Sequence, residues 1–367
     1  MKSWVLLTIG ATALLALLGY AGAVGVEIWS DWRARPETQH STPANGAIPL
    51  GVLGDSDSQS YHDSVNAPAR FGRYQDVTFQ WTEVLTRLRG QQIDLGERGV
   101  RGTRRSVARL MDALGLPGRH PRKDDNLFNL AVGGTGCDSL MGYTGRQAPR
   151  LVTAMNLDPA RWRRGIVVIR IGINDLGSIE VLDALARDPA DPGVRARADA
   201  CLAQISAAVA LIHAAHPMTR IVLVGVLSNA DDPSNFERWR SGPAYQNIRQ
   251  GLRYFDQGLA RMAAGDKRLA FFDDSAWFEA RWGGRDAQGL PAYKTLQLGP
   301  QHIPVTMTPG DHPSHAVTED LHAGVVWTTL WAQSLVQLMN SAFDAGITPI
   351  SDDEVAAFLT PALQLPP

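Results

Sequence analysis

Two β-branched runs constrain the fold of this 367-residue chain more than any other feature. Residues 166–171 read Ile-Val-Val-Ile-Arg-Ile, and residues 221–227 read Ile-Val-Leu-Val-Gly-Val-Leu. Near-continuous apolar strands of this kind are typical of a parallel sheet that is covered on both faces. Helical patterns lie before and after each run, so the sequence predicts strands that alternate with helices.

The same alternation continues along the chain. Strands are expected at 48–53, 126–132, 166–171, 221–227 and 269–272. Helices are expected at 81–88, 107–114, 147–156, 194–215, 244–264 and 323–339. The predicted fold class is therefore α/β, a three-layer sandwich with a parallel sheet of about five strands and helices on both faces. The predicted domain spans residues 47–340, with long insertions at 57–125 and 275–315, and a C-terminal tail follows at 341–367.

The first 29 residues predict an export segment that does not belong to the fold. Residues 4–26, from Trp4 to Val26, carry no charge, and Lys2 precedes them. The small residues at 21–23 resemble a signal-peptide cleavage site. The run is also long enough to span a bilayer, so an uncleaved membrane anchor is the slightly preferred alternative. Either interpretation predicts an exported, periplasmic or extracellular domain, preceded by a linker at 30–46.

Composition and motifs exclude several classes of function. The formal net charge is −2, which gives no basic footprint for nucleic acid. The glycines at 133, 134 and 136 lack the spacing of a dinucleotide or Walker motif, so no cofactor is predicted. No metal site is predicted either. Cys137 and Cys201 are the two cysteines, and in an exported protein they either pair or remain buried thiols.

Ser56 is the candidate nucleophile. It lies in Gly54-Asp55-Ser56, directly after the strand expected at 48–53. Ligands of parallel sheets bind at the carboxyl ends of strands, which is where this serine is expected. The same residues also suit an ordinary polar turn, so the prediction depends on finding partners for Ser56.

A serine hydrolase needs a base, a group that orients the base, and donors for the oxyanion. The turn after residue 132 offers the backbone N–H of Gly134, and the turn after residue 171 offers the side-chain amide of Asn174. His322 precedes the last expected helix and has carboxylates two and three residues before it. Candidates for every role therefore follow expected strands or precede the last helix.

Four motifs, in this order, resemble those of the SGNH hydrolases, the GDSL esterase–lipase family. They are Gly54-Asp55-Ser56, the pair Asn129 and Gly134, Gly172-Ile173-Asn174-Asp175, and His322 with Ala332 ten residues later. The resemblance covers about residues 47–340 and implies a flavodoxin-like sheet. It also implies that Ser56 is the nucleophile, that His322 is the base, and that Ser56, Gly134 and Asn174 form the oxyanion hole.

The acid of the triad is left open by the sequence. The family usually has aspartate three residues before the histidine, where this chain has Glu319. Asp320 lies two residues before it and is the alternative. Asp311 and His315 form a rival pair. His315 is not directly followed by an expected helix and has no alanine ten residues after it, so His322 is preferred.

The function expected from these residues is that of an exported serine esterase, which hydrolyses a sugar O-acetyl or a lipid acyl ester. Its partner would be a small-molecule, lipid or glycan ester. Two alternatives remain at this point. One is an envelope polysaccharide O-acyltransferase with the same triad, and the other is a catalytically inactive binding protein on the same fold. The oligomeric state is not predicted.

Overall fold

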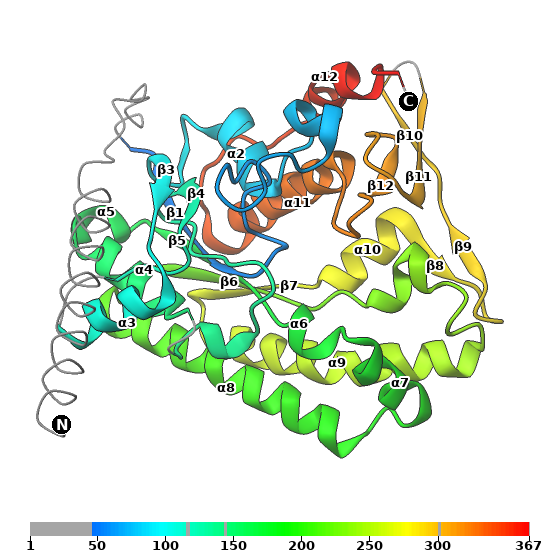
Figure 1. Ribbon diagram of the computed structural model, residues 1–367, viewed down its shortest axis with the longest axis horizontal. Helices are drawn as coiled ribbons and strands as arrows, with labels where there is room; N and C mark the ends of the chain where they lie inside the picture. The colour runs from blue at the N-terminus through cyan, green and yellow to red at the C-terminus, as the bar shows by residue number, and fades with distance from the viewer. Residues whose placement is uncertain (1–45, 115–117, 143–144, 300–301, 367) are drawn as a thin grey trace, which may run out of the picture.

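A five-stranded parallel sheet forms the centre of the computed structural model, which describes residues 46–114, 118–142, 145–299 and 302–366 (Figure 1). The predicted export segment and nearly all of the predicted linker lie outside these residues. The strands run in the order β2-β1-β5-β6-β7. They are β1 Ile48–Gly54, β2 Ile93–Asp94, β5 Ile166–Arg170, β6 Arg220–Val224 and β7 Leu269–Phe272. This is the 2-1-3-4-5 order of a flavodoxin-like sheet, which confirms the predicted α/β class.

Helices cover both faces of the sheet, and side-chain alternation assigns each strand residue to one face. In β5, Ile166 and Val168 join the core under α2 and α11, while Val167 and Ile169 join the core against α4, α8 and α9. Figure 1 shows these two groups of helices on opposite sides of the strands. Their bounds are α2 Trp81–Arg89, α11 Val325–Phe343, α4 Gln147–Met155, α8 Pro192–Ala215 and α9 Gly242–Ala264.

The prediction of a strand at 126–132 is wrong, because these residues do not form one regular strand. Its first residue belongs to β4 (Lys123–Asn126), which pairs with β3 (Arg98–Arg101) in a separate antiparallel sheet. Residues 127–132 run alongside β1 and exchange hydrogen bonds with Val52 and Gly54, but the only bridge between them is Val52 to Asn129. The edge strand is instead β2, whose two residues are too short to give a sequence signal.

The predicted insertion at 275–315 contains a hairpin of β8 (Gly283–Arg285) and β9 (Pro291–Tyr293). A three-stranded sheet of β10 (Leu296–Leu298), β11 (Ile303–Pro309) and β12 (His315–Val317) follows it. The remaining α-helices of the described residues are α3 Arg105–Ala113, α5 Pro159–Trp162, α6 Ile173–Leu176, α7 Ile179–Arg187, α10 Asp274–Trp282 and α12 Asp352–Leu363. The sequence did not predict α7 or α10.

The C-terminal residues pack on the domain. Ser351 and Glu354 form the capping box that begins α12, as their spacing predicts. Ile347, Val355 and Leu359 are buried in the core that contains α2 and α11. Of the helices in the described residues, α8 alone has the length and hydropathy of a membrane span, and its buried stripe belongs to the other core.

Candidate active site

Ser56 follows β1 in a turn whose first residue is fixed by a side-chain amide. The N–H of Gly54 donates to Oε1 of Gln147, and its carbonyl oxygen accepts from Nε2 of the same side chain, both at 2.8 Å. A Cβ at Gly54 would lie 2.4 Å from the carbonyl oxygen of Arg170 on β5. Only glycine therefore fits the end of β1, and the following turn starts from a fixed point.

The turn is also held on its other side. The carbonyl oxygen of Asp57 accepts from Nη1 of Arg170 at 3.1 Å and from Nε1 of Trp81 at 3.0 Å. Arg170 is buried and makes an ion pair of 3.0 Å with the buried carboxylate of Asp274. Breaking such a pair leaves a buried charge without its partner, so this arrangement resists local movement. Ser56 thus lies between two anchored residues.

The carboxylates next to the candidate site residues have structural contacts. Oδ1 of Asp55 accepts from the N–H of Asp57 at 3.0 Å, and burial, reinforced by the nearby Asp57 carboxylate, raises the pKa of Asp55 well above its usual value. Oδ2 of Asp175 accepts from the N–H of Cys137 at 2.9 Å, and burial raises the pKa of Asp175. Both side chains therefore brace turns.

His322 has a carboxylate partner. Its Nδ1 lies 3.0 Å from Oδ1 of Asp320, which also accepts from Oγ1 of Thr318 at 2.6 Å. Oδ2 of Asp320 accepts from the guanidinium of Arg70 at 2.8 Å. Burial alone would raise the pKa of Asp320, but the hydrogen bonds from His322, Arg70 and Thr318 outweigh it and hold this pKa well below the usual range.

The backbone conformation explains why Asp320, and not Glu319, contacts the imidazole of His322. Leu321, between Asp320 and His322, has a φ of 65°, in the left-handed region that few side chains adopt. This tight turn folds the carboxylate of Asp320 back onto the ring. Glu319 contributes its backbone N–H, which donates to Oδ1 of Asp311 at 3.0 Å. In the described part of the chain, the Glu319 carboxylate makes no hydrogen bond with His322.

The rival histidine is engaged elsewhere. Nδ1 of His315 lies 2.7 Å from Oγ1 of Thr308 on β11. Burial, followed by the nearby His312, lowers the pKa of His315. His315 does not line the cavity that contains Ser56.

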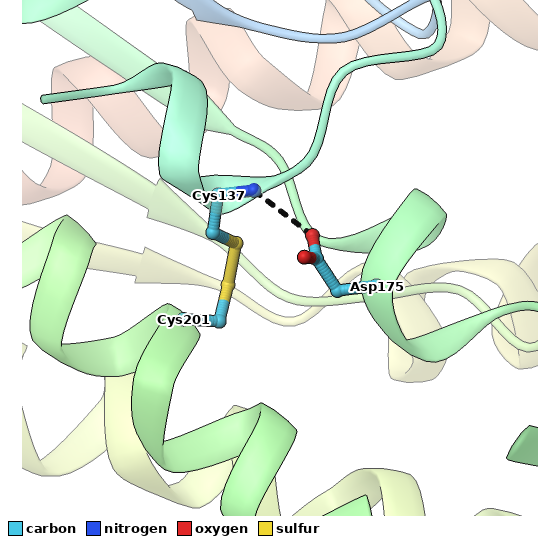
Figure 2. Close-up of side chains that lie close together, drawn as sticks. All are labelled: Cys137, Asp175 and Cys201. Atoms are coloured by element: carbon cyan, nitrogen blue, oxygen red, sulfur yellow. Dashed lines mark hydrogen bonds between the residues drawn. A yellow bond between two sulfur atoms is a disulfide. The ribbon is translucent and has the colours of Figure 1, made fainter. Parts of the chain in front are cut away.

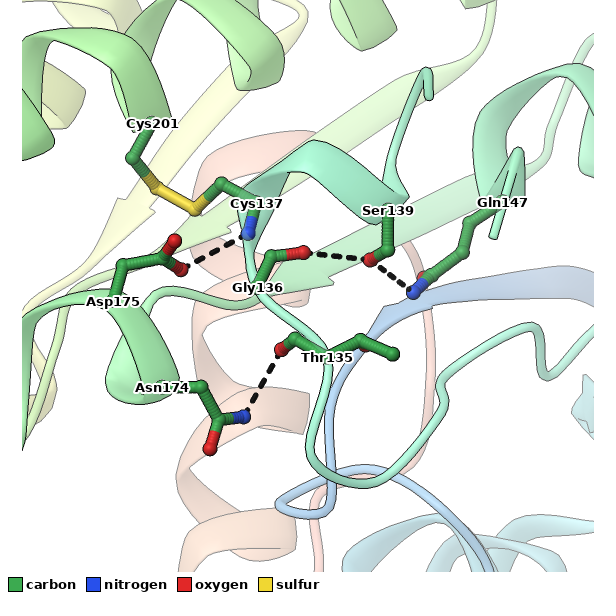
Figure 3. The surroundings of a disulfide bond; sticks show 8 residues. All are labelled: Thr135, Gly136, Cys137, Ser139, Gln147, Asn174, Asp175 and Cys201. Carbon is green, nitrogen blue, oxygen red and sulfur yellow. Dashed lines mark hydrogen bonds between the residues drawn. A yellow bond between two sulfur atoms is a disulfide. The ribbon is translucent and has the colours of Figure 1, made fainter. Parts of the chain in front are cut away.

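The candidate oxyanion donors lie on two neighbouring turns. A Cβ at Gly133 would lie 3.6 Å from Cβ of Ser56, so the turn that carries Gly134 adjoins the serine. Gly134 itself is exposed and has a φ of 71°, which glycine adopts without strain. Nδ2 of Asn174 donates to the carbonyl oxygen of Thr135 at 3.0 Å, and an amide of this kind has a second hydrogen to donate (Figure 3).

A cavity of about 240 Å³ brings the candidate residues together at the carboxyl end of the sheet. Ser56, Asn174, Asp320 and His322 line it, whereas Glu319 and Gly134 do not. The other lining residues are Asp57, Arg170, Ile173, Leu227, Ser228, Asn229, Asp231, Asp232, Met307, Val317, Leu321, Ala323 and Trp327.

The sheet order, and the arrangement of three of the four motifs around this cavity, match the resemblance noted in the sequence. The chain has the flavodoxin-like α/β sandwich that this resemblance implies. Its second motif contributes a turn next to Ser56, where the buried Asn129 donates to the carbonyl oxygen of Ser58 at 2.8 Å.

Among solved structures similar to this chain is the lipase Lip_vut3 from a goat rumen metagenome, 11% identical, with a TM-score of 0.40 over 83% of this chain and 100% of that chain. A GDSL-like lipase from Parabacteroides merdae is 12% identical, with a TM-score of 0.34 over 83% and 98%. Phospholipase A1 from Streptomyces albidoflavus is 13% identical, with a TM-score of 0.29 over 64% and 83%. No protein-family model and no curated protein matches the chain. These values describe similarity of the backbone fold and give no information about the substrate.

Cys137 and Cys201 form a disulfide, with their Cα atoms 5.1 Å apart. This settles the alternative that the sequence left open. The bond joins the 3₁₀ turn that follows Gly134 to α8 (Figure 2). The N–H of Cys137 also donates to Asp175 on α6, which ties the same turn to the helix that carries Asn174 (Figure 3).

Several residues of the candidate site were not predicted. Arg70 and Gln147 act on residues far away in the chain, so no spacing rule finds them. Thr318 gives a faint signal, because threonine hydroxyls commonly bond to backbone groups in turns, as Thr318 does when it accepts from the N–H of His322 at 3.0 Å. Asp231 follows β6, and the rule that sites form at strand ends points to it, although its chemistry was not anticipated.

Proposed function

We propose that this chain is an exported serine esterase of the SGNH type that hydrolyses a carboxylic ester. The observation that supports it best is the pairing of His322 with Asp320 on the wall of the cavity that Ser56 also lines. A histidine whose Nδ1 faces a carboxylate presents Nε2 as a base, and the carboxylate stabilises the imidazolium that forms.

In the proposed mechanism, His322 accepts the hydroxyl proton of Ser56 as the serine oxygen attacks the ester carbonyl. The N–H groups of Ser56 and Gly134 and the amide of Asn174 would stabilise the oxyanion of the tetrahedral intermediate. His322 then donates its proton to the leaving alcohol, which breaks the ester bond and leaves an acyl-serine. Water, deprotonated by His322, releases the acid. These steps require no metal or cofactor.

Export is part of the proposal. Residues 4–26 carry no charge, and the disulfide between Cys137 and Cys201 is of the kind that persists in oxidising compartments. Together they support a periplasmic or extracellular domain, with the N-terminal run as a signal peptide or a membrane anchor.

Hydrolysis of p-nitrophenyl acetate by the full-length protein in mild detergent tests the proposal. Ser56→Ala and His322→Ala are each expected to lower kcat by about 10⁴-fold or more. Ser228→Ala is the matched control, because Ser228 lines the same cavity and its hydroxyl only caps a 3₁₀ turn. Activity that survives Ser56→Ala, or that falls equally in Ser228→Ala, would remove the proposed nucleophile.

A further inference from the structure

The wall of the cavity after β6 contains a carboxylate that the proposed mechanism does not use. Asp231 lines the cavity, yet only 6% of its surface is exposed. Its Oδ1 accepts from the hydroxyls of Tyr245 on α9 and Tyr293 on β9, each at 2.7 Å. Two tyrosines from different elements thus hold Oδ1 of this carboxylate, and neither of them bonds to Oδ2.

Oδ2 of Asp231 receives no hydrogen bond from any residue in the described ranges. The backbone around it is fixed, because the buried Arg285 donates to the carbonyl oxygens of Ala230 and Trp239. Oδ2 is not sealed from solvent, so water or a molecule bound in the cavity can supply a donor to it. Asp231 is therefore a rigid acceptor that is available to a bound molecule.

Trp327 also lines the cavity, but its Nε1 is buried and has no acceptor among the described residues, so this donor is not available to a ligand. The acceptor that this wall offers is therefore Oδ2 of Asp231. A ligand hydroxyl can donate to this oxygen and an alkyl chain cannot, so a hydroxylated ligand suits the wall better.

The charge of the cavity disfavours anions. Asp57, Asp231 and Asp232 line it in addition to the triad acid. Its one Lys or Arg in the described ranges is Arg170, which is already paired with Asp274. A phosphate or carboxylate on the alcohol half of an ester would face these carboxylates without a free cation.

The size of the cavity restricts the substrate further. Its volume of about 240 Å³ is below the ~300–1,000 Å³ typical of pockets for drug-sized ligands. Part of that space must hold the acyl group next to Ser56. A short acyl group and a small ring or triol fit this volume better than a long acyl chain.

We infer that Asp231 binds a hydroxyl of the alcohol half of the substrate, and that the substrate is a short-acyl ester of a neutral polyol such as a sugar. This inference rests on the proposed esterase function. Asp231 is a specificity residue in it and takes no part in proton transfer. A cationic alcohol is the competing ligand for a carboxylate, and the experiment includes it.

The test compares glyceryl monoacetate with ethyl acetate, which share the acetyl group and differ in the hydroxyls of the alcohol. The full-length protein is expected to have a kcat/KM for glyceryl monoacetate at least about tenfold higher, and Asp231→Ala is expected to remove most of this ratio, since a charge-assisted hydrogen bond corresponds to about 10- to 100-fold. Asp232→Ala is the matched control, because Asp232 lines the same cavity but is only half-buried and therefore better hydrated, and the ratio should stay within about threefold.

If Asp231→Ala does not fold, Asp231→Asn decides, because it keeps the Oδ1 acceptor of both tyrosines and replaces Oδ2 by a donor. A fall of at least about fivefold in the ratio is expected. A ratio near one in the wild type, an unchanged ratio in the variant, or a preference for acetylcholine over glyceryl monoacetate overturns this inference alone, provided that p-nitrophenyl acetate is still hydrolysed. Loss of Ser56-dependent hydrolysis overturns the esterase proposal as well.

Discussion

Nε of Arg70 donates to Oδ2 of Asp320 at 2.8 Å, and Nη2 of the same guanidinium lies 2.8 Å from that oxygen in an ion pair, although 250 residues separate the two in sequence. The same guanidinium lies over the ring of Tyr61, 4.3 Å from its centroid, and near that of Phe71 at 4.6 Å. Arg70 is thus held by aromatic contacts while it holds Asp320. The oxygen that remains, Oδ1, faces His322.

Arg70 is therefore expected to act as a positioning residue. Arg70→Met should lower kcat for p-nitrophenyl acetate by about tenfold with KM nearly unchanged, because the loss of a positioning contact affects the transition state more than substrate binding. Arg70→Lys should recover part of the loss. Arg73→Met is the control, because Arg73 contacts Tyr74 and not the triad. Equal kinetics for the Arg70 and Arg73 variants would contradict the role.

The choice between the two acids can be measured directly. Asp320→Asn should lower kcat by about 10³- to 10⁴-fold, as expected when the group that fixes the imidazole tautomer is lost. Glu319→Gln should stay within about threefold of wild type, because only its backbone N–H makes a described hydrogen bond. The opposite order of effects would assign the acid to Glu319.

The disulfide should contribute to stability. It closes a loop with a sequence separation of 64, and cross-links of that kind typically add about 2–5 kcal/mol to the free energy of unfolding. The double variant Cys137→Ser, Cys201→Ser should therefore unfold at lower urea concentration than wild type. Reductant should destabilise wild type to a similar extent and leave the double variant unchanged. A reductant effect of equal size in both proteins would contradict this assignment.

Glu83 should make stability depend on acidic pH. Burial alone would raise its pKa, but hydrogen bonds from His62, Ser60 and Gln80 outweigh it and lower the pKa to about 2 from 4.5. A depressed pKa stabilises the fold above the unfolded value of 4.5, and this contribution, of up to about 3 kcal/mol, is lost as the pH falls towards 2.

The measurement is the free energy of unfolding in urea between pH 6 and pH 2, for wild type and for Glu83→Gln. The variant should be less stable at pH 6 and should lose less stability on acidification, because its side chain cannot be protonated in this range. Parallel curves would show that other carboxylates account for the acid sensitivity.

The sequence was sufficient to predict where the candidate residues lie when their position depends on local order. Ser56 follows β1 and Asn174 follows β5, so each candidate lies at the end of an apolar run, as the sequence predicts. The bounds of the long helices α8 and α9 were also predicted within a few residues, because these helices carry regular apolar stripes.

The remaining features depend on contacts between distant segments. Nothing near Arg70 in the sequence indicates that it meets Asp320. The left-handed conformation of Leu321 brings the nearer acid to His322, and a leucine gives no signal for such a turn. The two residues of β2 are too few for a periodicity, and residues 127–132 bond to β1 without forming a regular ladder.

The most direct test of the proposed triad is covalent labelling with a fluorophosphonate, which reacts with activated serines. The full-length protein should be labelled, and mass spectrometry of its peptides should place the adduct on Ser56. Ser56→Ala should not be labelled, and Asp320→Asn should be labelled far more slowly. A wild-type protein that is folded yet unlabelled, or an adduct on another serine, would contradict the account.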